Sequence, residues 1–428
     1  MTRTERPIRK READHIIQAL EGGIVPRLGL GHLLVGRGLQ VAEVVRRLEE
    51  VEDGRSDLMI WVGDFGSGKS FLLRTIEQLA LRRNFITATV DLSPTRRFQA
   101  SDGKGVALYQ EVMRQLQSRQ AGPGQALDHI LKTWIRPMLE EGTDLEARIL
   151  GTFSALPAGG LRYELGQAVL AYGRGLERAE EERKLQALRW MGGQIATKTE
   201  AKQALGIGRI VTDDNWTLLL ENWADFFRAV GYSGWVVNFD ELVNLYKLPR
   251  AQSRAQNYER LLNLYNDLKE GRVAGLFVNL AATRKTVFDE RRGLVSYGAL
   301  KSRLGVRHEA LEDLVNTAAT VQPLRPLSDE EIFTLLDKLQ EIFQVAYPTC
   351  ALFQEEEIAA YMQAQLNRPG AAEFLTPRAV IKDFLELLQL GRQHPERTLA
   401  SLLDQRFGHL QRVEKDQDDH DDELIRIL

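Results

Sequence analysis

The chain has 428 residues, of which 43% are hydrophobic and 27% are charged, and its formal net charge is −4. This composition is typical of a globular protein with room for two or three domains, and it excludes a surface that is basic throughout. Its single cysteine, Cys350, excludes an intramolecular disulfide and a multi-cysteine metal site. No apolar run approaches the roughly 18 residues of a bilayer span, so we expect a cytoplasmic protein without a membrane partner.

The first segment, residues 1–55, is predicted to contain N-terminal helices. Hydrophobic spacing indicates one helix over residues 8–20 and another over residues 41–51. Residues 6–11 form a basic patch, for which contact with DNA and plain solvation of an N-terminal arm both stay open.

Residues 63–70 read Gly-Asp-Phe-Gly-Ser-Gly-Lys-Ser, which is a Walker A phosphate-binding sequence. Glycines let such a loop curl until its backbone N–H groups point at phosphates, while the lysine reaches the β and γ oxygens and the serine binds Mg²⁺. A predicted strand at residues 58–62 enters the loop and an amphipathic helix leaves it, flanks that a chance match would lack. The sequence therefore predicts a site for ATP and Mg²⁺, with nucleotide contacts from Gly63, Gly66, Ser67, Gly68, Lys69, Ser70 and Phe71.

A second strand is predicted over residues 85–92, apolar on both faces as in a parallel sheet. The stretch from about residue 100 to about residue 230 is longer than one strand and two helices require, and we interpret it as a helical insertion where a specific partner would dock. Within it, the charged run 177–184 is interpreted as the solvated face of a helix. Helical patterns cover residues 105–119, 125–140, 160–192 and 214–230.

Residues 235–241 read Trp-Val-Val-Asn-Phe-Asp-Glu, a buried strand that ends in two carboxylates. A P-loop enzyme needs such a Walker B strand to hold the metal and to orient water. Asp240 is predicted to bind Mg²⁺ through water, together with Ser70, and Glu241 to orient the attacking water. An ordinary strand end with a solvated acidic pair is the alternative, and Glu241 favours hydrolysis over mere binding.

Residues 274–283 predict a further strand whose polar end lies at the ligand edge of the sheet. Thr283 is a candidate catalytic sensor that would hydrogen-bond the γ-phosphate or the water, and Asn279 is a second candidate. A purely structural threonine remains open.

From residue 324 onward the pattern changes to helices alone. A capping box opens the first, and a threonine followed by proline opens the third. Residues 324–410 are therefore predicted to form a helical lid, and residues 411–428 an acidic, disordered tail.

Together these parts resemble the AAA+ ATPases, nearest to the origin-recognition initiators. The resemblance implies an α/β P-loop NTPase fold, with a parallel sheet in residues 56–323, a large helical insertion and a C-terminal helical lid. It implies adenine-side contacts from Gly36 and Arg37 and a sensor 2 contact from Arg378. Arg303 lies in a run similar to the arginine-finger segment and would reach the γ-phosphate of a neighbouring subunit in a homo-oligomer; a solvated arginine is the alternative.

More specifically, roughly residues 15–395 resemble the P-loop ATP-binding proteins of bacteriophage-exclusion (BREX) systems, of the BrxD type. The segments that carry this resemblance are residues 22–26, 35–37, 63–71, 231–234, 300–304 and 376–378. Where the family pattern has Gly-Thr, this chain has Ala281-Ala282-Thr283, which affects the sensor assignment and not the fold.

Membership would imply phage defence beside other defence proteins of methyltransferase, phosphatase-like and helicase-like types. Origin-recognition relatives carry a winged helix after the lid, but too few residues follow it here. DNA contact would therefore come from the insertion, the N-terminal arm or a partner.

Two functions stay open after this reading. One is an AAA+ ATPase that assembles and uses hydrolysis to act on DNA or to remodel a defence complex. The other is a nucleotide-operated switch or scaffold that binds ATP, changes shape and recruits a partner with little turnover. The intact Lys69, Ser70, Asp240 and Glu241 argue against a scaffold with a vestigial loop.

Overall fold

The computed structural model describes residues 7–157, 159–305, 316–350, 352–367, 376–398, 401–403 and 405. The chain divides into two compact units. The first, here called the helical unit, comprises Met1–Gly38, Phe65–Gly68 and Arg325–Leu428. The second, here called the sheet unit, comprises Leu39–Asp64 and Lys69–Leu324.

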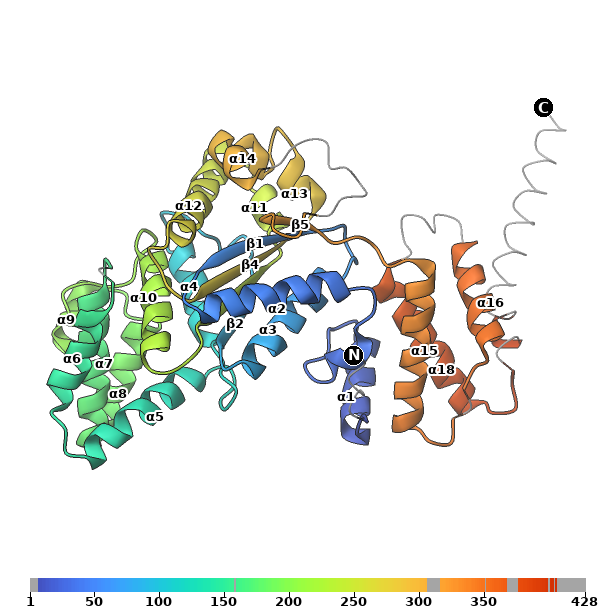
Figure 1. Cartoon of the computed structure of the whole chain (residues 1–428), viewed down its shortest axis with the longest axis horizontal. Coiled ribbons are helices and arrows are strands. Elements are labelled where there is room, and N and C mark those ends of the chain that lie inside the picture. The colour runs from blue at the N-terminus through green and yellow to red at the C-terminus, as the bar shows by residue number, and fades with distance from the viewer. Residues whose placement is uncertain are drawn as a thin grey trace. The chain divides into compact units, whose positions relative to one another are not determined.

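A five-stranded parallel sheet forms the centre of the sheet unit (Figure 1). Its strands stand in the order β2-β3-β4-β1-β5. The prediction of an α/β fold with a parallel sheet is confirmed. The very short β5 was not predicted, because a three-residue segment that ends in proline shows no strand pattern. The strands are β1 (Asp57–Val62), β2 (Ile86–Asp91), β3 (Trp235–Asp240), β4 (Leu276–Ala282) and β5 (Val321–Pro323).

Helices cover both faces of this sheet (Figure 1). On one face, α2 (Gly38–Glu52) and α3 (Lys69–Arg82) bury alternate strand residues such as Met59 and Val236. On the other face, α4 (Lys104–Arg114), α10 (Trp216–Ala229) and α12 (Ala251–Lys269) bury the intervening ones. The strands β1, β3 and β4 are buried along their whole length. The strand for which burial on both faces was predicted, β2, is buried except towards its carboxyl end, where Asp91 is exposed.

The segment between β2 and β3 is helical, as predicted. Besides α4 and α10 it contains α5 (Ala126–Glu140), α6 (Leu145–Ala155), α7 (Arg162–Glu177), α8 (Glu181–Met191) and α9 (Lys198–Leu205). The apolar side chains of these helices, for example Ile130, Ile149 and Leu165, belong to one hydrophobic cluster with Ile60 of the sheet. The insertion and the sheet therefore share a core.

The helical pattern predicted over residues 160–192 forms two helices, α7 and α8, but the interpretation of the run 177–184 as one solvated helix face is wrong. The chain reverses between α7 and α8, where Ala179 has a left-handed backbone with φ of +57°. The charged run 177–184 thus crosses a turn, and the side chain of Lys184 is buried at its end. The sequence of this run does not mark a helix end, since it lacks glycine and proline. The packing of α7 on α8 determines where the chain turns.

Short helices follow the ends of β3 and β4 and complete this unit (Figure 1). These are α11 (Val243–Tyr246), α13 (Arg284–Phe288), a 3₁₀ turn at Leu294–Ser296 and α14 (Gly298–Leu304).

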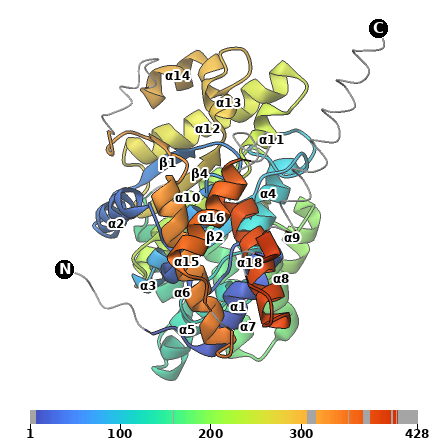
Figure 2. The ribbon, with the colours of Figure 1, turned by 90° about the vertical axis from the view of Figure 1, so that its right-hand side faces the viewer.

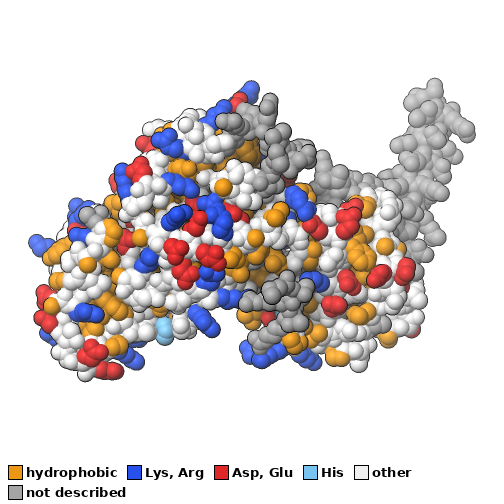
Figure 3. Space-filling view, in the orientation of Figure 1, with side chains coloured by type: hydrophobic (Ala, Val, Ile, Leu, Met, Phe, Trp, Pro, Cys, Tyr) orange, Lys and Arg blue, Asp and Glu red, His pale blue; other side chains and the backbone are white. Residues whose placement is uncertain are grey.

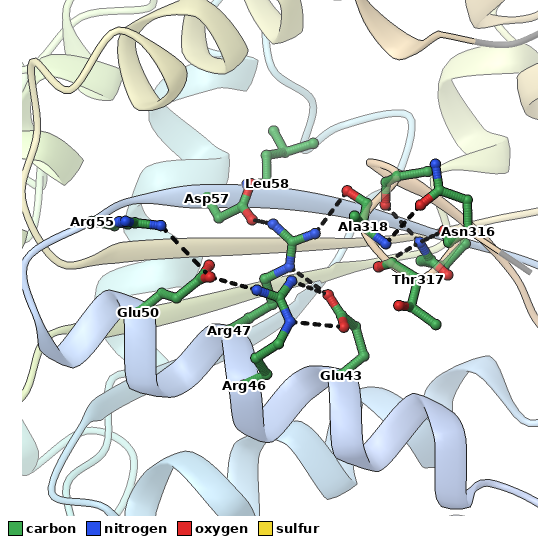
Figure 4. A network of polar contacts seen from close by, with 12 residues as sticks. Glu43, Arg46, Arg47, Glu50, Arg55, Asp57, Leu58, Asn316, Thr317 and Ala318 are labelled. Atoms are coloured by element: carbon green, nitrogen blue, oxygen red, sulfur yellow. Dashed lines mark hydrogen bonds and ion pairs between the residues drawn. The ribbon is translucent and has the colours of Figure 1, made fainter.

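A network of ion pairs joins α2 to β1 (Figure 4). Arg47 of α2 donates to Glu43 at 2.6 Å, to Asp57 of β1 and, at 2.8 Å, to the carbonyl of Ala318. Lys269 of α12 also pairs with Asp57. Burial alone would raise the pKa of Glu43, but hydrogen bonds from the arginines at 46 and 47 hold it below its usual value. The network therefore fastens helices from both faces to the first residue of β1.

The helical unit is built from α1 (Lys10–Glu21), a 3₁₀ turn at Leu30–Leu33, α15 (Asp329–Ala346), α16 (Glu355–Leu366) and α18 (Pro377–Gln393). α15 packs against α1, α16 and α18 (Figure 2). Ser328 and Glu331 form the predicted capping box, and Thr376 caps α18 with proline at its first position. The predicted acidic tail, residues 411–428, lies outside the described residues.

Side chains of both charges are interspersed over the face drawn in Figure 3. Among the helices that the structure describes, none has the length and apolar character needed to cross a bilayer.

Candidate nucleotide site

The Walker A serine and the Walker B aspartate meet in the sheet unit. Ser70 Oγ donates to Asp240 Oδ2 at 2.5 Å, and Asp240 Oδ1 accepts the backbone N–H of Glu241 at 2.7 Å. Ser70 lies on α3, which follows β1, and Asp240 ends β3. β4 stands between β1 and β3, and α3 brings Ser70 across to the end of β3. The structure thus brings the two predicted metal ligands together, and a hydroxyl beside a carboxylate is the kind of oxygen pair that Mg²⁺ prefers.

Lys69 lies at the base of the loop. Its Nζ donates to the carbonyl oxygens of Gly63 at 2.8 Å and Asp64 at 2.7 Å. Burial lowers the pKa of this ammonium group, while the carboxylates of Asp240 and Glu241 oppose that shift. The lysine therefore sits within electrostatic reach of both Walker B carboxylates.

Glu241 has a strained backbone. Its φ of +57° is rare for a residue other than glycine, and the bond from the N–H of Leu242 to the carbonyl of Ala281, at 3.1 Å, fixes the chain just after it. Partial burial of its carboxyl group, and then the charges of Asp240 and Asp91, raise its pKa. A carboxylate with a raised pKa is a better proton acceptor near neutral pH.

The tip of the Walker A loop belongs to the helical unit. Gly66 and Gly68 have φ of +81° and +88°, and a Cβ on Gly66 would lie 2.4 Å from the Cβ of Thr376, so only glycine fits there. Ser67 is buried, and its Oγ has no hydrogen-bond partner among the described residues. A buried hydroxyl without a protein partner in a glycine-rich loop fits a group that donates to a phosphate oxygen.

Arg37 lies against this loop tip. It is only 4% exposed and its Nη2 donates to the carbonyl of Ser67 at 2.8 Å. Burial, and then the charge of Arg325, lower the pKa of its guanidinium group. Gly36, next to it, has φ of +66°, and a Cβ there would lie 2.6 Å from the carboxyl carbon of Glu331. The arginine therefore supports the loop backbone, a contact that the sequence alone did not suggest.

Arg378, at the start of α18, donates from Nε to the carbonyl of Gly23 at 2.9 Å and makes a second contact there through Nη2. It links α18 to the Gly-Gly turn that follows α1. Phe71, also predicted to contact the nucleotide, lies in the first turn of α3, where its carbonyl accepts from Thr75 Oγ1 at 2.9 Å.

The two sensor candidates lie in different surroundings. Thr283 directly follows β4 and caps α13: its Oγ1 accepts the N–H of Thr286 at 3.3 Å and lies 2.8 Å from that residue's Oγ1. Asn279 is fully buried within β4 and accepts from Trp61 Nε1 at 3.0 Å. Thr283 alone stands at the edge of the sheet where Asp240 ends β3.

Arg303, the predicted finger, lies on α14 and is exposed. Its Nε is 3.4 Å from Asn266 Oδ1, a long hydrogen bond on the surface of α12. The side chain is therefore displayed outward from the sheet unit.

One residue that the sequence reading did not single out lies beside the pair. Asp91 ends β2 and stands in register with Asp240 of β3. Its only sequence signal is its place as an acidic residue at the end of a buried strand.

A comparison of the chain with curated proteins finds no match. A comparison with protein-family models finds one that covers residues 8–406, for the family described as BREX system ATP-binding protein BrxC/D. This span includes the Walker A loop, the carboxylates of Asp240 and Glu241, and Arg378. The chain therefore belongs to the BrxC/D family of BREX system ATP-binding proteins.

Proposed function

We propose that this chain binds ATP with Mg²⁺ and hydrolyses it, as an AAA+-type ATPase of a BREX phage-defence system. The observation that carries the proposal is the 2.5 Å hydrogen bond from Ser70 to Asp240, because it joins the two sequence motifs that Mg²⁺–ATP hydrolysis requires. The family match supports the ATP and the defence context.

In this proposal each residue has a chemical role. The loop from Gly63 to Gly68 and the ammonium group of Lys69 bind the phosphates, and Ser70 and Asp240 hold the metal ion, which when bound would neutralise charge on the phosphate oxygens. Glu241 orients the attacking water and accepts its proton.

The remaining predicted residues act around this centre. Thr283 contacts the γ-phosphate or the water, Arg303 acts on a neighbouring subunit, and Gly36, Arg37 and Arg378 act on the adenine side or through the loop. The strand order supports an AAA+-type sheet, since one strand separates the Walker A strand from the Walker B strand.

We further propose a cytoplasmic homo-oligomer whose insertion or N-terminal arm contacts other defence proteins or DNA. In domain terms, we propose an N-terminal segment to residue 55, a core over 56–323 and a lid over 324–410.

The Lys69→Ala variant tests nucleotide binding. Removing the ammonium group takes away a positively charged partner of the phosphates, so we expect ATP affinity to fall at least about tenfold, consistent with charge-assisted contacts of about 1.5–3 kcal/mol. Isothermal titration with Mg²⁺–ATP measures this, with Lys198→Ala, an exposed residue of the insertion, as the control. ATP affinity unchanged in Lys69→Ala would contradict the proposed site.

A nucleotide-operated switch with little turnover is the second candidate. Two contacts favour it, because they already occupy side chains that hydrolysis would use. Thr283 accepts a hydrogen bond from Thr286 of α13, and Arg378 donates one to the carbonyl of Gly23. ATP turnover as a function of protein concentration, with and without double-stranded DNA, separates the two functions. Turnover per subunit that rises with concentration or DNA supports the ATPase, and a rate near zero at every concentration supports the switch.

A further inference from the structure

Asp91 lies beside Asp240 on the same face of the sheet. In neighbouring parallel strands, residues in register point to the same side, and Asp91 and Asp240 are in register at the carboxyl ends of β2 and β3. The helix α3 covers that side of the sheet. Two residues earlier on the same side, Thr89 and Asn238 are also in register, and Asn238 Nδ2 donates to Thr89 Oγ1 and to the carbonyl of Leu73 of α3, each at 3.1 Å.

The spacing of this earlier pair shows how close the two strands are. Thr89 and Asn238 are in register and hydrogen-bonded to each other, and Thr89 also donates to Glu77 of α3. One row further along, the corresponding side chains are the carboxylates of Asp91 and Asp240. Ser70, on the first turn of α3, already bonds one of them.

The charge of Asp91 is not neutralised by an ion pair. As a whole residue Asp91 is exposed, and no hydrogen bond or ion pair to its carboxylate is found among the described residues. Partial burial and then the charge of Asp240 raise its pKa, although Arg74 and Arg96 oppose this. It also helps to raise the pKa of Glu241. Two carboxylates held side by side repel each other unless a cation is shared between them.

We propose that Asp91 is a further residue of the Mg²⁺–ATP site, where it holds a water molecule of the metal's hydration shell next to Asp240. This inference rests on the proposed function. Among the described residues, no three His, Cys, Asp or Glu side chains group closely enough to ligate a metal ion directly. Mg²⁺ usually keeps several of its waters in such sites, and the proposal therefore places a water molecule between the metal and Asp91. Asp91 is a positioning residue, acting on the metal through this water.

Binding of Mn²⁺, an oxygen-preferring substitute for Mg²⁺, tests the proposal without relying on activity. Electron paramagnetic resonance measures free Mn²⁺ during titration of the full chain with ATP present. We expect Asp91→Asn to weaken Mn²⁺ binding about tenfold, as loss of a second-sphere partner does, with ATP binding in EDTA unchanged. Asp53→Asn is the matched control: Asp53 is also exposed, has no described partner and precedes β1 at the opposite end of the strands.

The outcomes separate the two proposals. If the unaltered chain binds neither ATP nor Mn²⁺–ATP, the proposed function fails. If it binds both, and Asp91→Asn binds Mn²⁺ as tightly as the unaltered chain, the role of Asp91 is contradicted; the same holds if Asp53→Asn weakens binding equally. Thermal unfolding in EDTA checks that each variant is folded, and Asp91→Ser, which also removes the charge, replaces Asp91→Asn if that variant does not fold.

Discussion

Ser70 and Asp240 show how little freedom the central pair has. Asp240 uses one carboxylate oxygen for Ser70 and the other for the N–H of Glu241, so its orientation is fixed from both sides. The same N–H bond helps to hold Glu241 in its left-handed backbone conformation. The fixed orientation of the proposed metal ligand Asp240 and the strain at Glu241 are thus two results of one contact.

Glu241→Gln isolates the acid–base part of this arrangement. Glutamine keeps the size of the side chain but cannot accept a proton, so we expect hydrolysis to fall about 10²- to 10⁴-fold while ATP binds within about twofold of the unaltered chain. Phosphate release and isothermal titration measure the two quantities. Glu259→Gln, on the exposed side of α12, is the control. An unchanged rate would remove Glu241 from the mechanism.

The sequence was sufficient to predict that Ser70 and Asp240 meet, although 170 residues separate them, because each lies in a recognisable Walker motif and a P-loop enzyme needs both motifs at one site. It was not sufficient for Arg37 and Asp91. The first reaches the carbonyl of Ser67 only after the chain folds back by 30 residues, and the second becomes a neighbour of Asp240 only through strand pairing. Contacts of this kind depend on tertiary packing, which hydrophobic periodicity does not report.

At the scale of elements, prediction succeeded where apolar residues repeat strongly and failed where they do not. The strands β1 to β4 and the helices α1, α3, α15 and α18 have clear buried patterns or caps. The helix α12, Ala251–Lys269, was not predicted: most of its residues are polar and only five of them are buried. Its place is decided by packing on the sheet, not by its own amphipathic pattern.

A buried acidic cluster between α10 and α12 predicts a pH dependence of stability. Glu221 and Asp225 lie on α10, and the charge of Asp267 on α12 acts on Glu221. Burial, and then the charges of Asp267 and Asp225, raise the pKa of Glu221 to about 8, with only Arg272 opposing; burial raises that of Asp225 to about 6. A carboxyl group whose pKa is higher in the folded chain than in the unfolded chain stabilises the fold fully when the pH is below its unfolded pKa. This stabilisation is lost as the pH rises toward 8, the folded pKa of Glu221.

Glu221→Gln removes this group without changing its size. We therefore expect the melting temperature of the unaltered chain to fall by several degrees relative to the variant between pH 5 and pH 8.5. Thermal unfolding followed by circular dichroism measures the difference across this range. With Glu259→Gln the difference should stay constant with pH; a constant difference for Glu221→Gln as well would show that its carboxyl titrates normally.

At the scale of the whole molecule, Arg303 tests whether one chain completes the site of another. A finger supplied by a neighbour stabilises charge in the transition state and contributes about 10³-fold or more to turnover. We expect Arg303→Ala to lose turnover by about this factor while ATP affinity stays unchanged, with Arg136→Ala, an exposed residue of α5, as the control. Equal loss of binding and turnover would indicate a role in folding instead.

Mixing two inactive variants sharpens this test. A subunit with Arg303→Ala retains Glu241, and a subunit with Glu241→Gln retains Arg303, so an interface between them contains one complete site. We expect phosphate release to reappear in the mixture. A mixture that binds ATP and assembles but stays inactive contradicts an arginine acting on a neighbouring subunit.

The continuous hydrophobic cluster that runs from Ile60 of the sheet to Ile149 of the insertion has an evolutionary consequence. Proteins often diversify by exchanging peripheral modules that fold on their own, and such exchange leaves the ancestral domain intact. Here the insertion shares its hydrophobic core with the sheet, and its removal would expose the strand residues that pack against it. For the partner contact proposed for the insertion, new specificity is therefore expected to arise by substitution on the outer surfaces of α5 to α9, and not by replacement of the whole segment.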